Sequence, residues 1–372
     1  MTDIASAPWR AATATAALLA VMTVATTAHA EEAAGRQGAR AGSLMEEIVV
    51  TATKREESIQ EVPISVAAVT GQRMDDMHAT TLEALQGTIP NVQIQSFANV
   101  PHGAVFNIRG MGVIEPDPYG GTTVVVVEDG VPQYFNMTAL LDTYDIQRVE
   151  VLRGPQGTLF GANSTGGVVQ VINEAPTGET GAKLEASYGN YDLIELRGAV
   201  EFPVVADVLA ARISGSHQSR DGFVTNIVNN QDMGSRDRSA VRVQLAFTPN
   251  DAFDARLIGA YSRHRDGGQD SAIGNIPGEA LYVPAGTTFP SDAYPDTVAR
   301  QPMYASPCAP GERCKAPSKY LSANSSVPDV SDMDTYSATL LMNWSTDIGE
   351  FTSITGFKDF ELHDFHDQDW TP

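Results

Sequence analysis

The sequence lacks the short signatures of the common enzyme classes. Neither GxSxG, HExxH nor CxxC occurs in its 372 residues, which argues against the usual hydrolase, zinc-protease and dithiol redox sites. Positive charge is also scarce, since 24 Lys and Arg stand against 46 Asp and Glu and give a formal net charge of −22. Such a surface does not suit a nucleic acid. We therefore expect no enzymatic activity, no cofactor and no nucleic-acid partner.

Cysteine is nearly absent. The two cysteines, Cys308 and Cys314, lie close together in the polar stretch CAPGERC. In an exported chain this spacing favours a disulfide between them, and the alternative is two free thiols.

Long hydrophobic runs are missing as well, apart from a short one near the N-terminus. Residues 11–27 carry no charge but are rich in Ala and Thr, and they fall short of the ~20 strongly apolar residues of a membrane helix. Ala28, His29 and Ala30 fit the small-x-small pattern of a signal-peptide cleavage site. We expect residues 1–30 to be a signal peptide removed on export, and an uncleaved membrane helix is the alternative.

A small-residue and polar tether at 31–45 leads into the stretch EEIVVTATKREE at 46–57. Its β-branched apolar residues favour a strand, yet no neighbouring apolar run or turn offers a partner in the sequence. We expect the segment to pair with another protein by adding a strand to an exposed sheet edge. A disordered linker is the alternative.

Residues 58–175 have the texture of a compact α+β domain. VPISVAAVT, FNIRGMG and TVVVVEDGVP read as strands and turns, TTLEALQGTIPNVQI reads as a helical stretch, and a second helical stretch is expected just before Asp145. Glycines cluster in RGPQGTLFGANSTGG, where they permit tight turns and close backbone approach. A phosphate-binding loop is excluded there, because residues 154–167 contain no Lys.

Beyond residue 180 apolar and polar residues alternate. In AVRVQLAF, the residues Val241, Val243, Leu245 and Phe247 share one face, and Arg242 shares the other with Gln244. Seven such strands are predicted, at 182–189, 191–201, 207–219, 237–247, 253–265, 334–345 and 350–362. From the second link onward their connections alternate between short and long, which is typical of a membrane β-barrel with tight periplasmic turns and long outer loops. A soluble sandwich gives no reason for that alternation.

At this point the sequence resembles the TonB-dependent outer-membrane receptors. EEIVVTA is similar to the TonB box of that family. VPISVAAVTGQRM, TLEALQGTIPNV, FNIRGMG, EDGVP and RVEVLRGPQGTLFGANSTGGVVQVI are similar to its plug in the family's order, and SYGNYDLIELRGAVEF resembles the first barrel hairpin. The resemblance implies a signal peptide at 1–30, a tether with the box at 31–57, an α+β plug domain at 58–175 and antiparallel transmembrane β-barrel strands at 176–372.

The resemblance also implies roles for particular residues. The segment that binds TonB and its inner-membrane energising complex is expected at Glu47, Ile48, Val49, Val50, Thr51 and Ala52. The residues expected in the plug core, or locking the plug to the barrel wall, are Arg109, Gly110, Glu150, Arg153, Gly154, Gly157 and Gly161. For the charged members, lumen-facing ion pairs are one reading and a solvated surface is the other.

The implied function is energy-coupled uptake of a scarce small extracellular ligand across the Gram-negative outer membrane, with a ferric siderophore favoured over vitamin B12 or a carbohydrate. A secreted plug-like binding module is the alternative from another class, and it would show no lipid-facing stripe. A metal site in HDFHDQD is not expected, because strand alternation puts His363 and His366 on opposite faces.

Barrel size gives one further expectation. Seven strands are far fewer than the roughly 22 of a plugged transporter barrel, so the barrel is expected to be incomplete and the sequence to be a truncated portion of a longer receptor.

Overall fold

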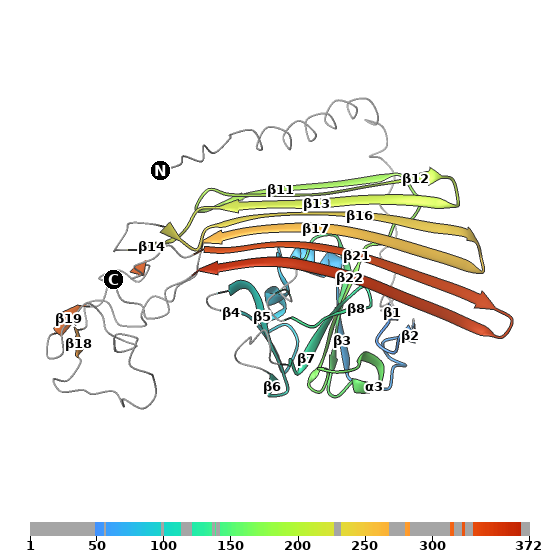
Figure 1. Ribbon diagram of the computed structural model, residues 1–372, viewed down its shortest axis with the longest axis horizontal. Coiled ribbons are helices and arrows are strands. Elements are labelled where there is room, and N and C mark those ends of the chain that lie inside the picture. Colours follow the sequence, from blue (N-terminus) through green and yellow to red (C-terminus); the bar gives the residue numbers. More distant parts are fainter. Residues whose placement is uncertain are drawn as a thin grey trace, which may run out of the picture. The chain divides into compact units, whose positions relative to one another are not determined.

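The computed structural model describes residues 49–55, 57–97, 100–112, 121–135, 138, 142–226, 232–267, 280–282, 313–315, 322–323 and 330–365 (Figure 1). The signal peptide, the tether, Glu47 and Ile48 lie outside them. Within the described residues, no helix combines the length and apolar character that a membrane crossing requires.

A five-stranded mixed sheet forms the centre of the plug. Its strand order is β3 (Val66–Thr70), β9 (Ile146–Arg153), β10 (Gly167–Asn173), β7 (Val124–Glu128) and β8 (Val131–Gln133). β10 and β7 run parallel, and the other pairs are antiparallel. The four valines of β7 are all buried, as expected for a strand covered on both faces.

The plug sheet carries an apolar core on each face. Val124 and Val126 belong to one cluster and Val125 and Val127 to the other, because successive strand residues point to opposite faces. The first cluster is completed by residues of α2 (Gly71–Asp76), the 3-10 turn η1 (Leu82–Leu85), β4 (Val92–Phe97) and β5 (Val100–Ile108). β5 also pairs with the short strand β6 (Met111–Gly112).

Local signals explain where the plug's helical segments begin and end. Thr70 caps α2, its hydroxyl accepting the amide of Arg73 at 3.3 Å. The helical stretch expected over 80–94 is wrong beyond its first turn: only Leu82–Leu85 is helical, and β4 follows. Gly87 has a φ of +78°, and Pro90 cannot continue a helix, so the chain leaves the turn and becomes extended. The helical stretch expected before Asp145 falls mostly outside the described residues.

A second, seven-stranded sheet forms the wall (Figure 1). Its strands follow in chain order and pair antiparallel: β11 (Gly181–Gly189), β12 (Leu193–Val205), β13 (Leu209–Arg220), β16 (Arg236–Asn250), β17 (Phe253–Gly267), β21 (Val330–Thr346) and β22 (Gly349–Phe365). The seven predicted strands are confirmed, most of them longer than predicted by a few residues.

The two faces of the wall differ as the alternation predicts. Val241 and Val243 are 42% and 43% exposed on the outer face. Arg242 and Gln244, between and beside them, are 4% and 0% exposed on the face toward the plug. The wall therefore presents apolar side chains outward and polar side chains inward, in an incomplete barrel whose sheet does not close within the described residues.

Short strands occur in the long connections. β14 (Val224–Asn226) pairs with β15 (Asp232–Met233) and β20 (Ser322–Ala323), and β18 (Ala280–Tyr282) pairs with β19 (Arg313–Lys315). Cys314 belongs to β19, but Cys308 lies outside the described residues, so their disulfide stays a prediction.

Candidate functional site

The N-terminal segment folds onto the plug. β1 (Val49–Val50) pairs antiparallel with β2 (Glu57–Ser58), and the side chains of Val50 and Ala52 are fully buried in the second apolar cluster, with Val125 among its members. The sequence suggested no partner within the chain for this stretch, and that expectation is wrong. The reason is physical: this face of the plug sheet is apolar and needs a cover, which Val50 and Ala52 supply.

A buried carboxylate holds the same segment by hydrogen bonds. The Thr51 amide donates to Glu150 Oε1 at 2.8 Å, and Gln170 Nε2 donates to the Thr51 hydroxyl at 2.6 Å. Glu150 is fully buried, and Arg148 Nε lies 2.7 Å from its Oε1. The ion pair stabilises a charge that would be costly to bury alone, so Glu150 remains available as an acceptor for Thr51.

The segment ends in a turn that packs on α3 (Gly157–Phe160). Lys54 has a φ of +66°, and its amide donates to the Thr51 carbonyl at 2.9 Å. The Lys54 ammonium lies 4.1 Å from the centre of the Phe160 ring, a cation–π contact. Burial lowers the pKa of Lys54 below its ordinary value. Residues 49–54 are thus held by strand pairing, apolar burial and polar contacts together.

The residues assigned to the plug core or its lock all lie in the plug. Glu150 serves the N-terminal segment, and Arg153 Nη1 donates to the Pro90 carbonyl at 3.3 Å. Arg109 and Gly110 are consecutive residues with positive φ after β5. Gly157 opens α3, Gly161 follows it with a φ of +77°, and Gly154 has a φ of +112°. The described contacts of Glu150 and Arg153 are internal to the plug, and among the described residues neither forms an ion pair with the wall, which was one of the two readings.

Other residues join the plug to the wall. Asp145 forms a bidentate pair with Arg212, at 2.9 Å to Nε and 2.5 Å to Nη2. Asp129 Oδ1 lies 2.8 Å from Arg256 Nη2. The further pairs are Asp142 with His264 at 3.2 Å, Asp142 with Arg238 at 3.8 Å, Glu128 with Arg242 at 3.8 Å, and Asp75 with Lys183 at 2.5 Å. In each pair the acid is on the plug and the base is on the wall.

Part of this plug–wall interface could be predicted from the sequence, namely which basic residues of the wall face inward. Strand alternation places Arg242 on the inner face and does the same for Arg256. The acids that meet the wall bases come from turns and strand ends of the plug, and Asp129 and Asp145 have positive φ. Which acid meets which base depends on pairs separated by 67 to 127 residues, which no local pattern encodes.

The buried plug acids differ in proton affinity. Burial alone would raise the pKa of Asp142, but His264 and Arg238 hold that pKa below its ordinary value. Burial raises the pKa of Asp129 above its ordinary value, and Arg256 and Asn173 oppose the rise only in part. Burial also raises the pKa of the Tyr144 hydroxyl to about 12, although Arg242 lies 4.6 Å from its ring centre. The charged contact of Asp142 therefore survives to lower pH than that of Asp129.

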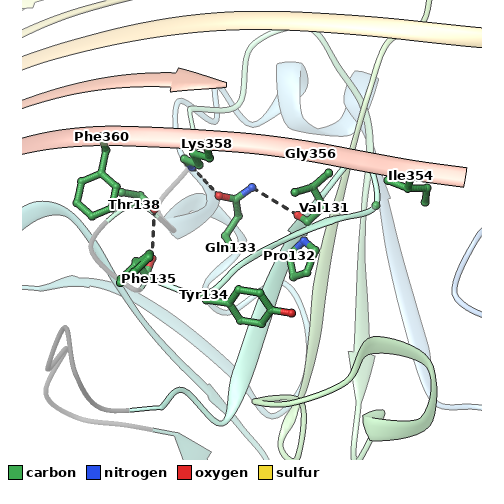
Figure 2. A pocket seen from close by; sticks show the side chains of 11 residues that line it. Val131, Pro132, Gln133, Tyr134, Phe135, Thr138, Ile354, Gly356, Lys358 and Phe360 are labelled. Carbon is green, nitrogen blue, oxygen red and sulfur yellow. Dashed lines mark hydrogen bonds between the residues drawn. The ribbon is translucent and has the colours of Figure 1, made fainter. Parts of the chain in front are cut away.

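The turn between β7 and β8 lies close against the wall strand β22 (Figure 2). A Cβ on Gly130 would lie 2.7 Å from Ile354 Cδ1, and one on Gly356 would lie 2.6 Å from the Val131 methyl carbons. Glycine at both positions is what lets the two backbones meet.

A cavity of about 400 Å³ opens beside this contact (Figure 2). Two contacts between the plug and β22 line this cavity. Lys358 Nζ donates to Gln133 Oε1 at 2.6 Å, and the rings of Phe135 and Phe360 meet edge to face with centres 5.4 Å apart. Here too the plug and β22 are joined by one polar and one aromatic contact.

The histidine cluster near the end of the chain gives no metal geometry in the described residues. His363 is exposed and its Nε2 lies 3.1 Å from Glu361 Oε1, while His366 lies outside the described residues. No group of three or more His, Cys, Asp or Glu suited to a metal ion occurs among the residues that the structure describes.

Comparison with known proteins places the plug. Residues 58–168 match the family model described as the TonB-dependent Receptor Plug Domain. The pesticin receptor of Yersinia pestis is 26% identical over 247 residues, which cover 65% of this chain and 36% of that receptor. The ferric-pyoverdine 358 receptor of Pseudomonas putida is 32% identical over 168 residues, 45% of this chain and 20% of that receptor. The chain thus spans about a third of the length of the first of these relatives.

Solved structures show the same fold. The ferric yersiniabactin uptake receptor FyuA from Yersinia pestis superposes with a TM-score of 0.62 at 20% identity, covering 82% of this chain and 42% of that one. The ferripyoverdine receptor of the outer membrane of Pseudomonas aeruginosa gives a TM-score of 0.62 at 18% identity, with 85% and 37% covered. The family match thus identifies residues 58–168 as a TonB-dependent receptor plug domain, and the solved structures show that the chain has the plug-and-barrel fold of such receptors.

Proposed function

We propose that this chain acts in an energy-coupled receptor that takes up a ferric siderophore across the outer membrane of a Gram-negative bacterium. The relatives named above are a pesticin receptor and receptors for ferric pyoverdine and ferric yersiniabactin. The outward apolar face of the wall suits contact with outer-membrane lipid, and this face argues against a secreted plug-like binding module. Residues 1–30 would direct export.

The polar character of the plug–wall interface is the observation that carries the proposal. The plug's own cores are apolar, whereas its described contacts with the wall include six acid–base pairs. When the plug moves against the wall, water can replace such polar contacts one at a time. Separating an apolar interface would instead cost about 25 cal/mol of free energy for each Å² of apolar surface exposed to water. A plug held in this way keeps its own fold and can still shift against the wall when it is pulled.

The N-terminal segment is the point where the pull would be applied. Among the described residues, β1 pairs only with β2 and leaves its other edge open. An extended segment of TonB could add itself to that edge as a further strand, using the residues from Glu47 to Ala52. Because the Thr51 amide is bonded to Glu150 on β9, tension on the segment would reach the centre of the plug sheet.

The ligand class is the part of the proposal with alternatives, since vitamin B12 or a carbohydrate would use the same mechanism. The test is a strain lacking the receptor, grown with ferric pyoverdine, ferric yersiniabactin, vitamin B12 or oligosaccharides as the limiting source. We expect this strain to lose growth only where a ferric siderophore is the limiting source, and to grow normally on vitamin B12 and on oligosaccharides. Growth lost only on vitamin B12 or a glycan would contradict the siderophore assignment.

Energy coupling is tested separately with the radiolabelled iron complex that supports growth. Collapse of the inner-membrane proton gradient is expected to stop uptake while binding at the cell surface persists. Uptake that continues at the normal rate after the gradient collapses would exclude an energised partner.

A further inference from the structure

Two arginines face each other on adjacent wall strands, at the end where the long connections begin. Arg220 is the last residue of β13 and Arg236 is the first of β16, and the two stand directly opposite in register. Like charges directly opposite on a sheet repel each other and destabilise the pairing. Unless negative charge lies beside them, the arrangement costs stability.

Two nearby carboxylates are already engaged with other arginines. Asp266 is chelated by Arg238, whose Nε lies 3.1 and 2.9 Å from its two oxygens and whose Nη2 lies 2.6 Å from Oδ2. Glu195 is paired with Arg197 at 2.5 Å. Both carboxylates are therefore held by other arginines, although the charge of Asp266 still acts on Arg220 and Arg236, and that of Glu83 acts on Arg236.

The arginine pair itself has few partners. Arg220 Nη2 donates to the Gly234 carbonyl at 2.7 Å, and its guanidinium lies 4.9 Å from the Phe223 ring centre. The buried Nε atoms of Arg220 and Arg236 have no hydrogen-bond partner, and no ion pair of either is found, in the part of the chain that the structure describes. Two guanidinium groups thus keep most of their donors available.

Both arginines line a cavity of about 420 Å³ between the wall and the plug. The cavity's acids, Glu185 and Glu195, come from β11 and β12 on one side, where Arg197 stands opposite Glu185 in register. The other side, on β13 and β16, carries Arg220 and Arg236. His78 and Thr80 line it from the plug. The cavity therefore has one side of unbalanced positive charge, in a chain whose net charge is −22.

We propose that Arg220 and Arg236 bind the carboxylate groups of the transported ligand, a carboxylate-bearing iron complex, at the outer end of the lumen. This inference rests on the proposed function, which assigns the end with long connections to the cell exterior. Each planar guanidinium offers two parallel N–H donors to a carboxylate, and such charge-assisted pairs are about twice as strong as neutral hydrogen bonds. A bound dicarboxylate would also remove the repulsion between the two arginines.

The test uses the purified full-length receptor in detergent, with ferric citrate, iron-free citrate and inorganic phosphate as calorimetric probes. Ferric citrate is expected to bind, and Arg220→Gln or Arg236→Gln to weaken it about tenfold or more, the loss of roughly one charge-assisted pair. Arg236→Lys keeps the positive charge but loses the two parallel N–H donors of the guanidinium. Its affinity for ferric citrate should therefore lie between that of the unaltered receptor and that of Arg236→Gln. The matched control is Arg263→Gln, which alters an exposed pair with Asp237 on the same sheet and should bind as the unaltered receptor does.

Folding and uptake are read separately from binding. Because Arg236→Gln relieves repulsion, its melting temperature without anion should equal or exceed that of the unaltered receptor. The proposal is overturned if ferric citrate does not bind, or if Arg263→Gln weakens it as much as the other variants. If iron-free citrate or phosphate binds and ferric citrate does not, the cavity is a site for free anions and the ligand assignment is overturned. Since no energised partner is present, failure of energy-dependent uptake would not affect this result.

Discussion

Replacing Val50 by Ala should release the N-terminal segment from the plug. The Val50 side chain is fully buried in the second apolar cluster. The change removes two methyl carbons, worth about 0.8 kcal/mol each, and leaves a small cavity that raises the cost to about 2 kcal/mol. At 1.4 kcal/mol per factor of ten, the undocked form should become about 30-fold more populated.

Amide hydrogen exchange of a peptide spanning residues 49–54 measures that population, because the Thr51 amide is protected by Glu150 when the segment is docked. Exchange should accelerate about 30-fold in Val50→Ala. Val49→Ala is the matched control: its side chain is 42% exposed, so exchange should change little. Equal acceleration in both variants, or none in either, would refute the docking of Val50 as the holding contact.

Three further predictions concern the plug–wall interface. Arg212→Met leaves Asp145 buried without its partner and should destabilise the plug–wall contact by about 3–5 kcal/mol, which a lower midpoint of urea unfolding would show. Arg263→Met is the control, because it removes one partner of an exposed pair and should cost less than about 1 kcal/mol. The pKa of Asp142 is lowered in the folded state, so its contribution is present above the ordinary carboxyl pKa of about 4 and is lost as pH falls through the lower folded value. Between pH 5 and pH 3 the melting temperature should therefore fall more steeply in the unaltered receptor than in Asp142→Asn, and parallel curves would contradict this. Gly356→Ala places a Cβ 2.6 Å from the Val131 methyl carbons and should cost about 1–3 kcal/mol of unfolding free energy, whereas Gly259→Ala meets nothing within 4 Å and serves as control.

The wall was predictable from the sequence because its information is local. A period of two in AVRVQLAF fixes both the strand and its faces, and the structure places Arg242 inward and Val243 outward accordingly. Strand order also followed, since short connections join neighbouring antiparallel strands.

The plug was predictable in class but less so in detail. Only a 3-10 turn formed where a longer helix was expected, because Gly87 and Pro90 interrupt the apolar pattern and the chain becomes the strand β4. The docking of Val50 depends on an apolar sheet face built from β7, β9 and β10, far away in the sequence. The acid–base pairs with the wall, such as Asp145 with Arg212, likewise form only once two separate sheets are assembled.

The most direct test of the account is uptake by the receptor carrying Val49→Pro. Val49 is exposed on β1, so the change should spare the plug core, while proline removes a backbone N–H from the strand that TonB would extend. We predict that the iron complex still binds at the cell surface and that its uptake stops, with Val49→Ala behaving as the unaltered receptor. Uptake at the normal rate in Val49→Pro would contradict the assignment of residues 47–52 as the segment through which the plug is pulled.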